Sequence, residues 1–278
     1  MKTFLTTIFS ITAILILGLA NAEAAVITDD FSDLNDTANP AWTHLNNFVL
    51  STGQAWDAST GQYHLTAPDN GFVSGTSQFG FVGSYTGPVS TDVIVKTDFV
   101  QNETGAAYGV GARMNGLNGA FNTATRNQGY VYAYEATARG GLGEMVMYHF
   151  GSNPFNPFED MGDPAGVEGV DWIRKVTLDV ANKDYTFTLS AIGNIITGVV
   201  SEVGGGVVAY QTHTDTTFTS GYSGVVAVGI KSTTAGDFPS NITIDNFSTA
   251  DVPEPATGLL VAFGAGAMLL CRRQLGNR

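Results

Sequence analysis

Apolar and polar residues alternate along much of the chain. In segment 93–99, Val93, Val95 and Phe99 alternate with Lys96 and Asp98. Successive side chains of a strand point to opposite faces of a sheet, so this alternation predicts a half-buried strand. Similar runs predict further strands at 79–85, 107–114, 129–135, 144–150, 173–180, 185–192, 195–203, 225–231 and 242–247.

The connections between these runs have turn chemistry. Asn115-Gly116, Asn118-Gly119 and Gly204-Gly205-Gly206 are typical of tight turns. No segment between residues 25 and 250 has a convincing helical period of apolar residues. We therefore predict an all-β fold, a two-sheet antiparallel sandwich or jelly roll, in one domain of residues 25–250.

Residues 1–24 have the composition of a secretory signal peptide. Lys2 supplies a positive start, and an apolar run covers residues 4–20. Ala20-Asn21-Ala22 and Ala22-Glu23-Ala24 both fit a small-residue cleavage site. An uncleaved transmembrane helix is the alternative, and the small residues favour cleavage.

The tail of residues 251–278 has three parts in a fixed order. Val252-Pro253-Glu254-Pro255 cannot lie inside a helix, because proline fixes φ and lacks a backbone donor. Residues 256–271 carry no charge and fall slightly short of the ~20 residues of a bilayer-spanning helix. Arg272 and Arg273 follow, as expected at the cytoplasmic end of such a helix. The alternatives are a plain membrane anchor and a buried C-terminal helix.

This combination of box, apolar helix and basic end resembles the PEP-CTERM sorting signal of Gram-negative bacteria. The resemblance implies that an exosortase is a partner and processes the tail. It also implies a precursor that is tethered to the inner membrane through the C-terminal helix. The mature protein is then expected at the cell surface or in the exopolysaccharide matrix.

The charge of the chain limits its partners. The formal net charge is −13, and without the two ends 8 basic and 23 acidic residues leave about −15. Such a surface repels nucleic acid and anionic lipid. The one cysteine, Cys271, lies in the tail, so the exported domain has no disulfide and no thiolate metal site.

A second resemblance covers most of the exported domain. The domain opens with Ile27-Thr28-Asp29-Asp30-Phe31 and closes with Ile242-Thr243-Ile244-Asp245-Asn246-Phe247. Between them stand aromatic and glycine-rich strands such as Tyr108-Gly109-Val110-Gly111-Ala112-Arg113. This order resembles the concanavalin A-like lectin/glucanase jelly roll, which implies that the first and last strands pair.

No catalytic constellation is visible in the sequence. The glucanases of that superfamily commonly carry E-x-D-x-x-E or a close variant, which places carboxylates on one strand face for glycosidic cleavage, and no such run is present here. Glu135 and Glu144 are the only glutamates in convincing middle strands, and neither has an acidic neighbour at i+2 or i+4. The segment around Ser223 misses the G-x-S-x-G elbow, and the four histidines lack zinc-site spacing.

Two groups of carboxylates suit structural Ca²⁺, although no cofactor is required. Asp160, Asp163, Glu168 and Asp171 crowd one loop and offer the hard oxygen ligands that Ca²⁺ prefers. The alternative is a solvated loop between two strands. Some jelly-roll relatives hold Ca²⁺ near the paired termini, which implies a second site at Asp30 and Asp245.

The strongest candidate for ligand binding is the run Tyr130-Val131-Tyr132-Ala133-Tyr134. Period two places Tyr130, Tyr132 and Tyr134 on one strand face, where a stripe of rings could stack on sugars, with Arg113 on a neighbouring strand. The alternative is that the rings cover the core from inside.

Two hypotheses for function follow. The first is a non-enzymatic surface or matrix protein that binds extracellular polysaccharide. The alternative is a glycan-active enzyme, a hydrolase or lyase on a jelly-roll scaffold, with Glu135 and Glu144 as the first suspects.

Overall fold

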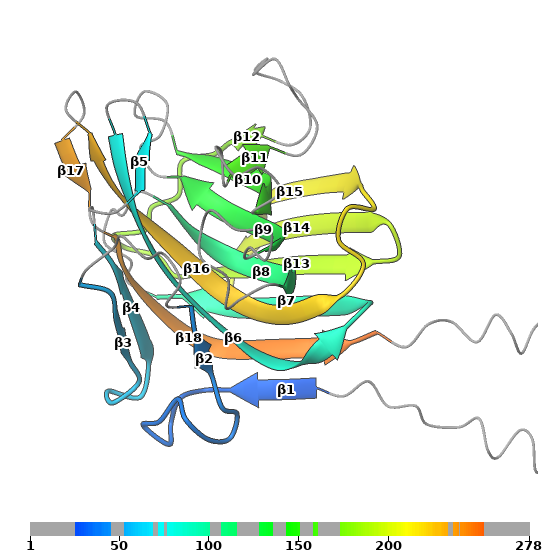
Figure 1. The fold of residues 1–278 in the computed structure, drawn as a ribbon, viewed down its shortest axis with the longest axis horizontal. Coiled ribbons are helices and arrows are strands. Elements are labelled where there is room, and N and C mark those ends of the chain that lie inside the picture. Colours follow the sequence, from blue (N-terminus) through cyan, green and yellow to red (C-terminus); the bar gives the residue numbers. More distant parts are fainter. Residues whose placement is uncertain are drawn as a thin grey trace, which may run out of the picture. The chain divides into compact units, whose positions relative to one another are not determined.

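A computed structural model describes the β-rich part of the chain (Figure 1). The described residues are 26–45, 53–68, 72–74, 77–100, 107–115, 128–135, 143–150, 158–160, 173–232, 236–238 and 240–252. The chain divides into a unit of Ala25–Asp251 and a second unit of the two chain ends. The predicted signal peptide and the tail beyond Val252 lie outside the described residues.

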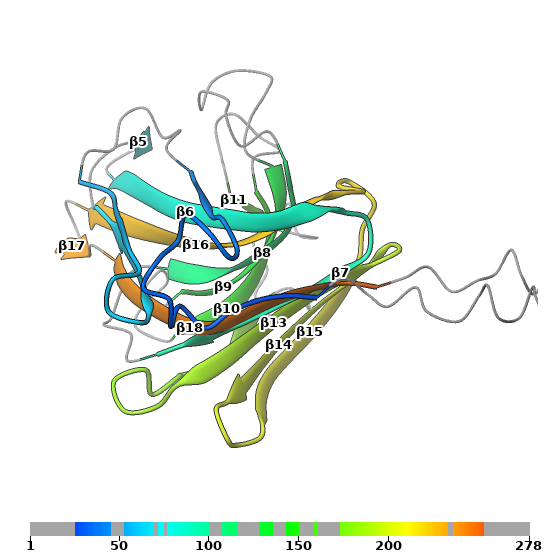
Figure 2. The same cartoon turned by 90° about the horizontal axis from the view of Figure 1, so that it is seen from below.

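Two antiparallel sheets form the domain, and Figure 2 shows them as two layers. Sheet A runs in the order β15 (Val207–Thr214), β14 (Ile195–Glu202), β13 (Tyr185–Ile192), β7 (Val93–Phe99), β18 (Ser240–Asp251), β4 (Tyr63–Ala67) and β3 (Ala55–Asp57), with β1 (Val26–Asp29) also paired to β18. Sheet B runs in the order β11 (Phe158–Asp160), β10 (Glu144–Phe150), β9 (Gln128–Glu135), β8 (Ala107–Asn115), β16 (Gly221–Ser232), β6 (Ser77–Ser90) and β2 (Thr43–His44). Three short strands join its edges: β12 (Ile173–Lys175) on β10, β17 (Gly236–Phe238) on β16 and β5 (Phe72–Ser74) on β6.

The predicted all-β sandwich of two antiparallel sheets is confirmed. The first and last strands pair, with Val26 opposite Ala250. The described residues contain no helix, and none of them forms a segment that could cross a membrane as a helix. The predicted span at 256–271 lies outside them.

One strand prediction needs correction, and one eight-residue strand was not predicted. The strand expected at 173–180 is only Ile173–Lys175, and the chain leaves sheet B after it. Strand β15 was not predicted, because its inward positions include the polar Gln211 and His213, and a register shift opposite Val200 and Ser201 interrupts the alternation. Polar inward residues remove the apolar signal on which strand prediction depends.

The main core lies between the sheets and is rich in aromatic rings. Phe99 lies 4.5 Å from Phe187 and 4.9 Å from Tyr108, measured between ring centroids. A second buried cluster, which includes Val131, lies on the other face of sheet B. Strands β8 and β9 are therefore buried on both faces.

The ring of Tyr132 in sheet B packs directly against Gly198 in sheet A. A Cβ placed on Gly198 would lie 2.6 Å from the Tyr132 ring, far inside van der Waals contact. Gly198 is on β14 and Tyr132 is on β9, so this contact sets how closely the two layers approach. A side chain at position 198 must push the ring or the sheet away.

We therefore expect Gly198→Ala to lower the free energy of unfolding by about 1–3 kcal/mol, the usual cost of overpacking a core. Gly206→Ala is the matched control, because a Cβ at Gly206 meets nothing within 4 Å. Urea denaturation followed by tryptophan fluorescence measures both variants. Equal stability of the two variants would contradict the contact.

Candidate functional site

Trp56 bridges the two sheets at one edge of the sandwich. It belongs to β3, the edge strand of sheet A, and its indole Nε1 donates a 2.9 Å hydrogen bond to the Gly83 carbonyl on β6 of sheet B. The ring is partly buried against the main core. This bond therefore fixes the orientation of a partly exposed indole at the sandwich edge.

His44 and Asp36 complete the exposed side of this edge. The His44 ring stacks on Trp56 with centroids 4.7 Å apart and an interplanar angle of 2°. Its Nε2 lies 2.7 Å from Asp36 Oδ2, and the two side chains are 31% and 15% exposed. A partly exposed indole, an imidazole and a carboxylate thus lie together at one place.

Tyr63 and Ser84 lie on the buried side of the same network. The Tyr63 hydroxyl and Ser84 Oγ are 2.7 Å apart, and both residues are fully buried. Burial raises the pKa of Tyr63, so its phenol stays neutral. Ser84 pairs with Tyr63 rather than with His44, and it has no access to solvent, so these residues do not form a hydrolase triad.

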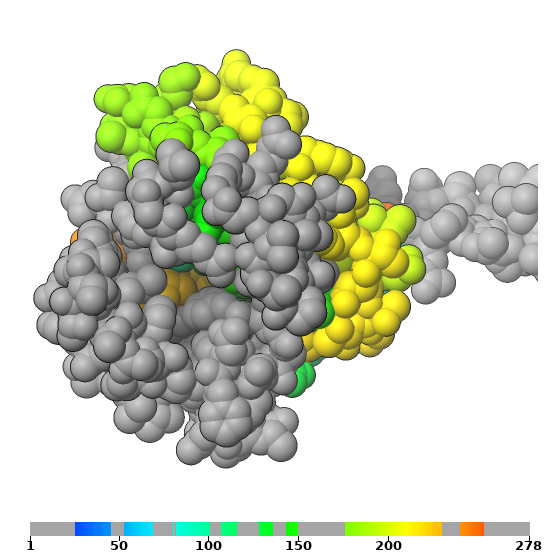
Figure 3. Space-filling model, turned by 90° about the horizontal axis from the view of Figure 1, so that it is seen from above, coloured from blue at the N-terminus to red at the C-terminus, as the bar shows by residue number. Residues whose placement is uncertain are grey.

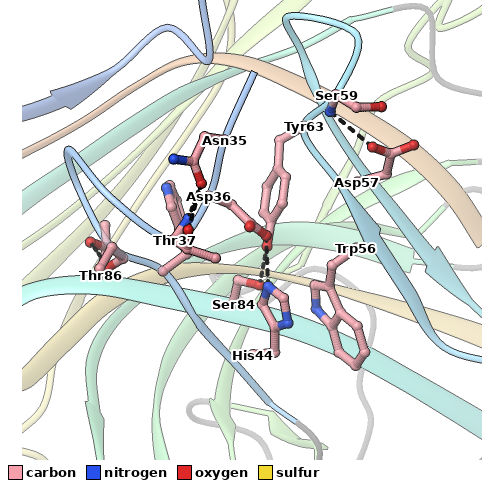
Figure 4. A network of polar contacts seen from close by, with 12 residues as sticks. Asn35, Asp36, Thr37, His44, Trp56, Asp57, Ser59, Tyr63, Ser84 and Thr86 are labelled. Carbon is pink, nitrogen blue, oxygen red and sulfur yellow. Dashed lines mark hydrogen bonds and ion pairs between the residues drawn. The ribbon is translucent and has the colours of Figure 1, made fainter. Parts of the chain in front are cut away.

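We call Asp36, His44, Trp56, Tyr63 and Ser84 the edge cluster. Figure 4 shows Asp36, Tyr63, Ser84 and His44 converging, with Trp56 beside His44. The cluster offers aromatic rings together with hydrogen-bond donors and acceptors, and the bond from Trp56 to the Gly83 carbonyl holds the indole on which His44 stacks. Sequence reasoning missed it, because the residues come from the segment before β2 and from strands β2, β3, β4 and β6, and share no motif.

The tyrosine stripe needs a correction. Tyr130, Tyr132 and Tyr134 share one face of β9 as predicted, but they are 0%, 0% and 3% exposed and belong to the main core. The rings cover the core from inside, which was the alternative. The prediction that these rings are open to stack on sugars is therefore wrong, and the small residues between them face the second buried cluster.

Tyr130, at one end of this stripe, places its hydroxyl group beside Asp215 and His149. Its hydroxyl donates a 2.6 Å bond to Asp215 Oδ1 and accepts one from the Phe218 amide at 3.0 Å. His149 Nε2 lies 3.2 Å from Asp215 Oδ2. Burial and the bond to Asp215 raise the pKa of Tyr130 to about 12.

The pKa of Asp215 is shifted in the opposite direction. Burial by itself raises it, but hydrogen bonds from Tyr130 and the Thr217 amide, with the nearby His149, outweigh burial and leave it below its usual value. The carboxylate is therefore held ionised between β15 and sheet B.

Arg113 is buried, at 2% exposure, and does not face a groove. Its Nη1 donates to the Phe218 carbonyl at 2.9 Å, and its Nη2 donates to the Gly193 carbonyl at 2.8 Å. Its Nε donates to the Thr91 carbonyl at 2.6 Å. These bonds tie three connections together, and the expectation that Arg113 contacts a ligand from an open surface is corrected.

Glu135 and Glu144 are direct partners across β9 and β10. Directly opposed residues of an antiparallel pair project from the same face, with Cβ atoms about 4.5–5.5 Å apart. Glu144 is 3% exposed. Because the partnership depends on strand register, the spacing of carboxylates along one strand does not reveal it.

The remaining predicted residues are less informative. Asp30 Oδ1 accepts a bond from the Ser32 amide, and Asp245 Oδ1 accepts one from the Asn246 amide. Within the described ranges, no group of three or more His, Cys, Asp or Glu residues could hold a metal ion. Asp160 lies on β11, whereas the other predicted residues lie outside the described part: Asp163, Glu168, Asp171, Pro253, Glu254, Pro255, Arg272 and Arg273.

Comparison with known proteins identifies the fold. No protein-family model and no curated protein matches the chain. A Bacillus subtilis protein of unknown function with a galectin-like fold is 12% identical, with a TM-score of 0.51 over 82% of this chain and 97% of that one. The fold is therefore galectin-like, in agreement with the predicted lectin-like jelly roll.

Two further solved structures are similar at lower scores. The carbohydrate-binding module CBM66 from Bacillus subtilis has a TM-score of 0.43 and 14% identity, over 76% of this chain and 95% of that one. Lectin II from Ulex europaeus has a TM-score of 0.45 and 10% identity, over 83% and 100%.

The lowered pKa of Asp215 predicts how stability depends on pH. A carboxylate whose pKa is depressed by folding stabilises the fold above its unfolded pKa of about 3.9, and this contribution is lost as the pH falls through the folded pKa. Asp215→Asn should thus lower the free energy of unfolding by about 1–2 kcal/mol at pH 7. The difference from wild type should shrink below about pH 3.9.

Urea denaturation between pH 7 and pH 3 tests this. Asp251→Asn is the control, because among the described residues the side chain of Asp251 has no hydrogen-bond or ion-pair partner. A deficit in Asp215→Asn that is the same at every pH would show that the charge of Asp215 is not its cause.

Proposed function

We propose that this protein is an exported carbohydrate-binding protein that holds a neutral glycan at the edge cluster. One observation carries the proposal: the partly exposed stack of His44 on Trp56 beside Asp36. Sugars present apolar C–H faces to aromatic rings and hydroxyl groups to polar side chains. The edge cluster supplies both kinds of contact at one place.

Charge favours a neutral ligand over an anionic one. The chain has a formal net charge of −13, which repels polyanions. In the edge cluster, Asp36 lies beside His44, so the exposed pair offers both an acceptor and a donor. A hydroxyl group can use both, since it donates and accepts hydrogen bonds.

The proposal is tested with the full-length chain in a mild detergent and a panel of soluble neutral glucans, galactans and xylans. We expect the wild type to bind at least one glycan, and we expect His44→Ala to weaken that binding about tenfold, equal to about 1.4 kcal/mol. His64→Ala is the control, since His64 bonds to Thr60 and Thr243 away from the edge cluster. Affinity electrophoresis measures each variant.

Two outcomes would contradict the proposal. The first is that the wild type binds no member of the panel. The second is that His44→Ala and His64→Ala weaken binding equally.

The same panel tests the alternative, a glycan-active enzyme. The direct partnership of Glu135 and Glu144 favours this alternative, because hydrolysis of glycosidic bonds uses two nearby carboxyl groups. Reducing ends released by wild type but not by Glu135→Gln would support that alternative.

We further propose that residues 252–273 act as a sorting signal that an exosortase recognises, so that the protein reaches the cell surface or matrix. The proposal is supported by the order of proline box, apolar run and Arg272-Arg273 pair. The box is then the recognition element, and the apolar run presents it at the membrane. Residue Val252 directly follows β18.

Replacing Pro253, Glu254 and Pro255 with Ala should leave membrane insertion intact, because the apolar run and the basic pair are unchanged. Processing should stop, so an uncleaved precursor accumulates in the inner membrane of an exosortase-bearing host. Immunoblots of membrane and surface fractions compare apparent mass and location. Identical mass and location in both proteins would leave only a plain anchor.

A further inference from the structure

The outer face of sheet A carries an uncovered, nearly uncharged strip of side chains. Strand register aligns six residues from six neighbouring strands in a first row: Thr212, Thr197, Ser190, Ile94, Ala250 and Val26. The register aligns a second row two residues further along each strand: Tyr210, Val199, Thr188, Lys96, Ser248 and Thr28. We call these two rows the outer lane.

All twelve side chains of the outer lane are partly or fully exposed. Tyr210 is 55% exposed and Val26 is 59% exposed, and both are among the large hydrophobic residues most open to solvent. Leu189 and Val95, which lie between lane residues on β13 and β7, are buried in the main core. In Figure 3 the yellow-green and yellow atoms of this part of the chain are visible along the upper and right margins of the view. By the exposure of its residues, the lane is a solvent-accessible sheet face.

Charge separates the outer lane from its surroundings. Lys96 is the one charged residue of the lane. The lane contains no Asp or Glu, although the net charge of the chain is −13. The next row along the strands is acidic, since Asp98 lies opposite Asp245. Seven of the twelve lane residues carry a hydroxyl group, and Thr197 and Thr212 are joined by a 3.1 Å hydroxyl contact.

The dimensions argue against a second copy of the chain as the occupant. Six strands at about 4.8 Å spacing give a length of roughly 24 Å, and two rows of side chains give a width of roughly 14 Å. The resulting area of roughly 340 Å² is less than half of the roughly 800 Å² per partner that a stable interface needs. A long, narrow ligand fits this shape better than a globular surface.

The chemistry argues against a membrane or a polyanion. Anionic surfaces are bound by clusters of Lys and Arg, whereas the lane has one lysine and the protein is acidic. Hydroxyl groups, small aliphatic groups and one tyrosine ring match the hydroxyl groups and C–H faces of an uncharged sugar chain.

We propose that the outer lane is a second binding surface, which docks one extended chain of a neutral polysaccharide across strands β15 to β1. The proposal rests on the proposed function, because it assumes that the natural ligand is a neutral glycan. It adds a place on the protein that is distinct from the edge cluster. Tyr210 is the aromatic contact, and the row of Thr212, Thr197 and Ser190 supplies hydroxyl groups.

The test uses the full-length chain in detergent and insoluble neutral polysaccharides, namely microcrystalline cellulose, curdlan, starch granules and chitin. Thr212→Asp places a carboxylate in the lane, and Thr177→Asp adds the same charge at an exposed residue outside the sheets. We expect Thr212→Asp and Tyr210→Ala to weaken binding at least tenfold on the polysaccharide that the wild type binds. Thr177→Asp should bind like the wild type.

Circular dichroism and urea denaturation confirm that each variant is folded. Because the lane is nearly uncharged, the wild-type affinity should change less than twofold between 50 mM and 500 mM salt. Equal binding by Thr212→Asp, Tyr210→Ala and the wild type would overturn the proposal that the outer lane binds polysaccharide, and would leave the proposed function intact. If His44→Ala abolishes binding and neither lane variant alters it, the edge cluster alone holds the glycan.

Other outcomes assign the lane to another occupant. A wild-type dimer that Thr212→Asp dissociates, seen by analytical ultracentrifugation, would show that the lane binds a second copy. Binding to phosphatidylglycerol vesicles that Thr212→Asp removes would show that it binds a membrane. If the wild type binds no neutral polysaccharide, soluble or insoluble, the lane and the proposed function both fail.

Discussion

The buried guanidinium of Arg113 fixes one end of the sandwich. It donates hydrogen bonds to the carbonyls of Thr91, Ala191, Gly193 and Phe218 and to the carboxylate of Asp92. These acceptors belong to the β6–β7 turn, the β13–β14 hairpin and the β15–β16 connection, so one cation ties segments of both sheets together. A buried charge is tolerated only when its partners are complete, so each of these connections depends on the others. Lysine cannot replace the planar fork that reaches them all.

Most of the fold could be predicted from the alternation of side chains, but the roles of the faces could not. The pattern of β9 assigns Tyr130, Tyr132 and Tyr134 to one face, and it does not show that the other face is buried as well. A strand that is buried on both faces reads as a continuous apolar run with no marked inside. Strand β15 could not be predicted for the opposite reason, since the polar Gln211 and His213 point inward and interrupt its apolar alternation.

The candidate sites depend on strand register and on contacts between the two sheets, which no local sequence pattern encodes. The edge cluster collects Asp36, His44 and Trp56 only because β2 and β3 end at the same edge of the sandwich and a hydrogen bond from Trp56 reaches sheet B. Glu135 and Glu144 meet because β9 and β10 pair in one register. A shift of one residue would move a partner to the opposite face. Such neighbours become visible only when the strands are placed side by side.

The pairing of the first and last strands has a mechanical consequence. Strand β18, which leads directly into Val252, is an interior strand that pairs with β7 on one side and with β1 and β4 on the other. A force applied to the tail therefore acts along this strand and loads the hydrogen bonds on both of its sides together, in shear. A pull on an edge strand such as β15 would instead peel one row of bonds at a time. A domain held from its C-terminal side in flowing medium thus carries drag through the middle of sheet A.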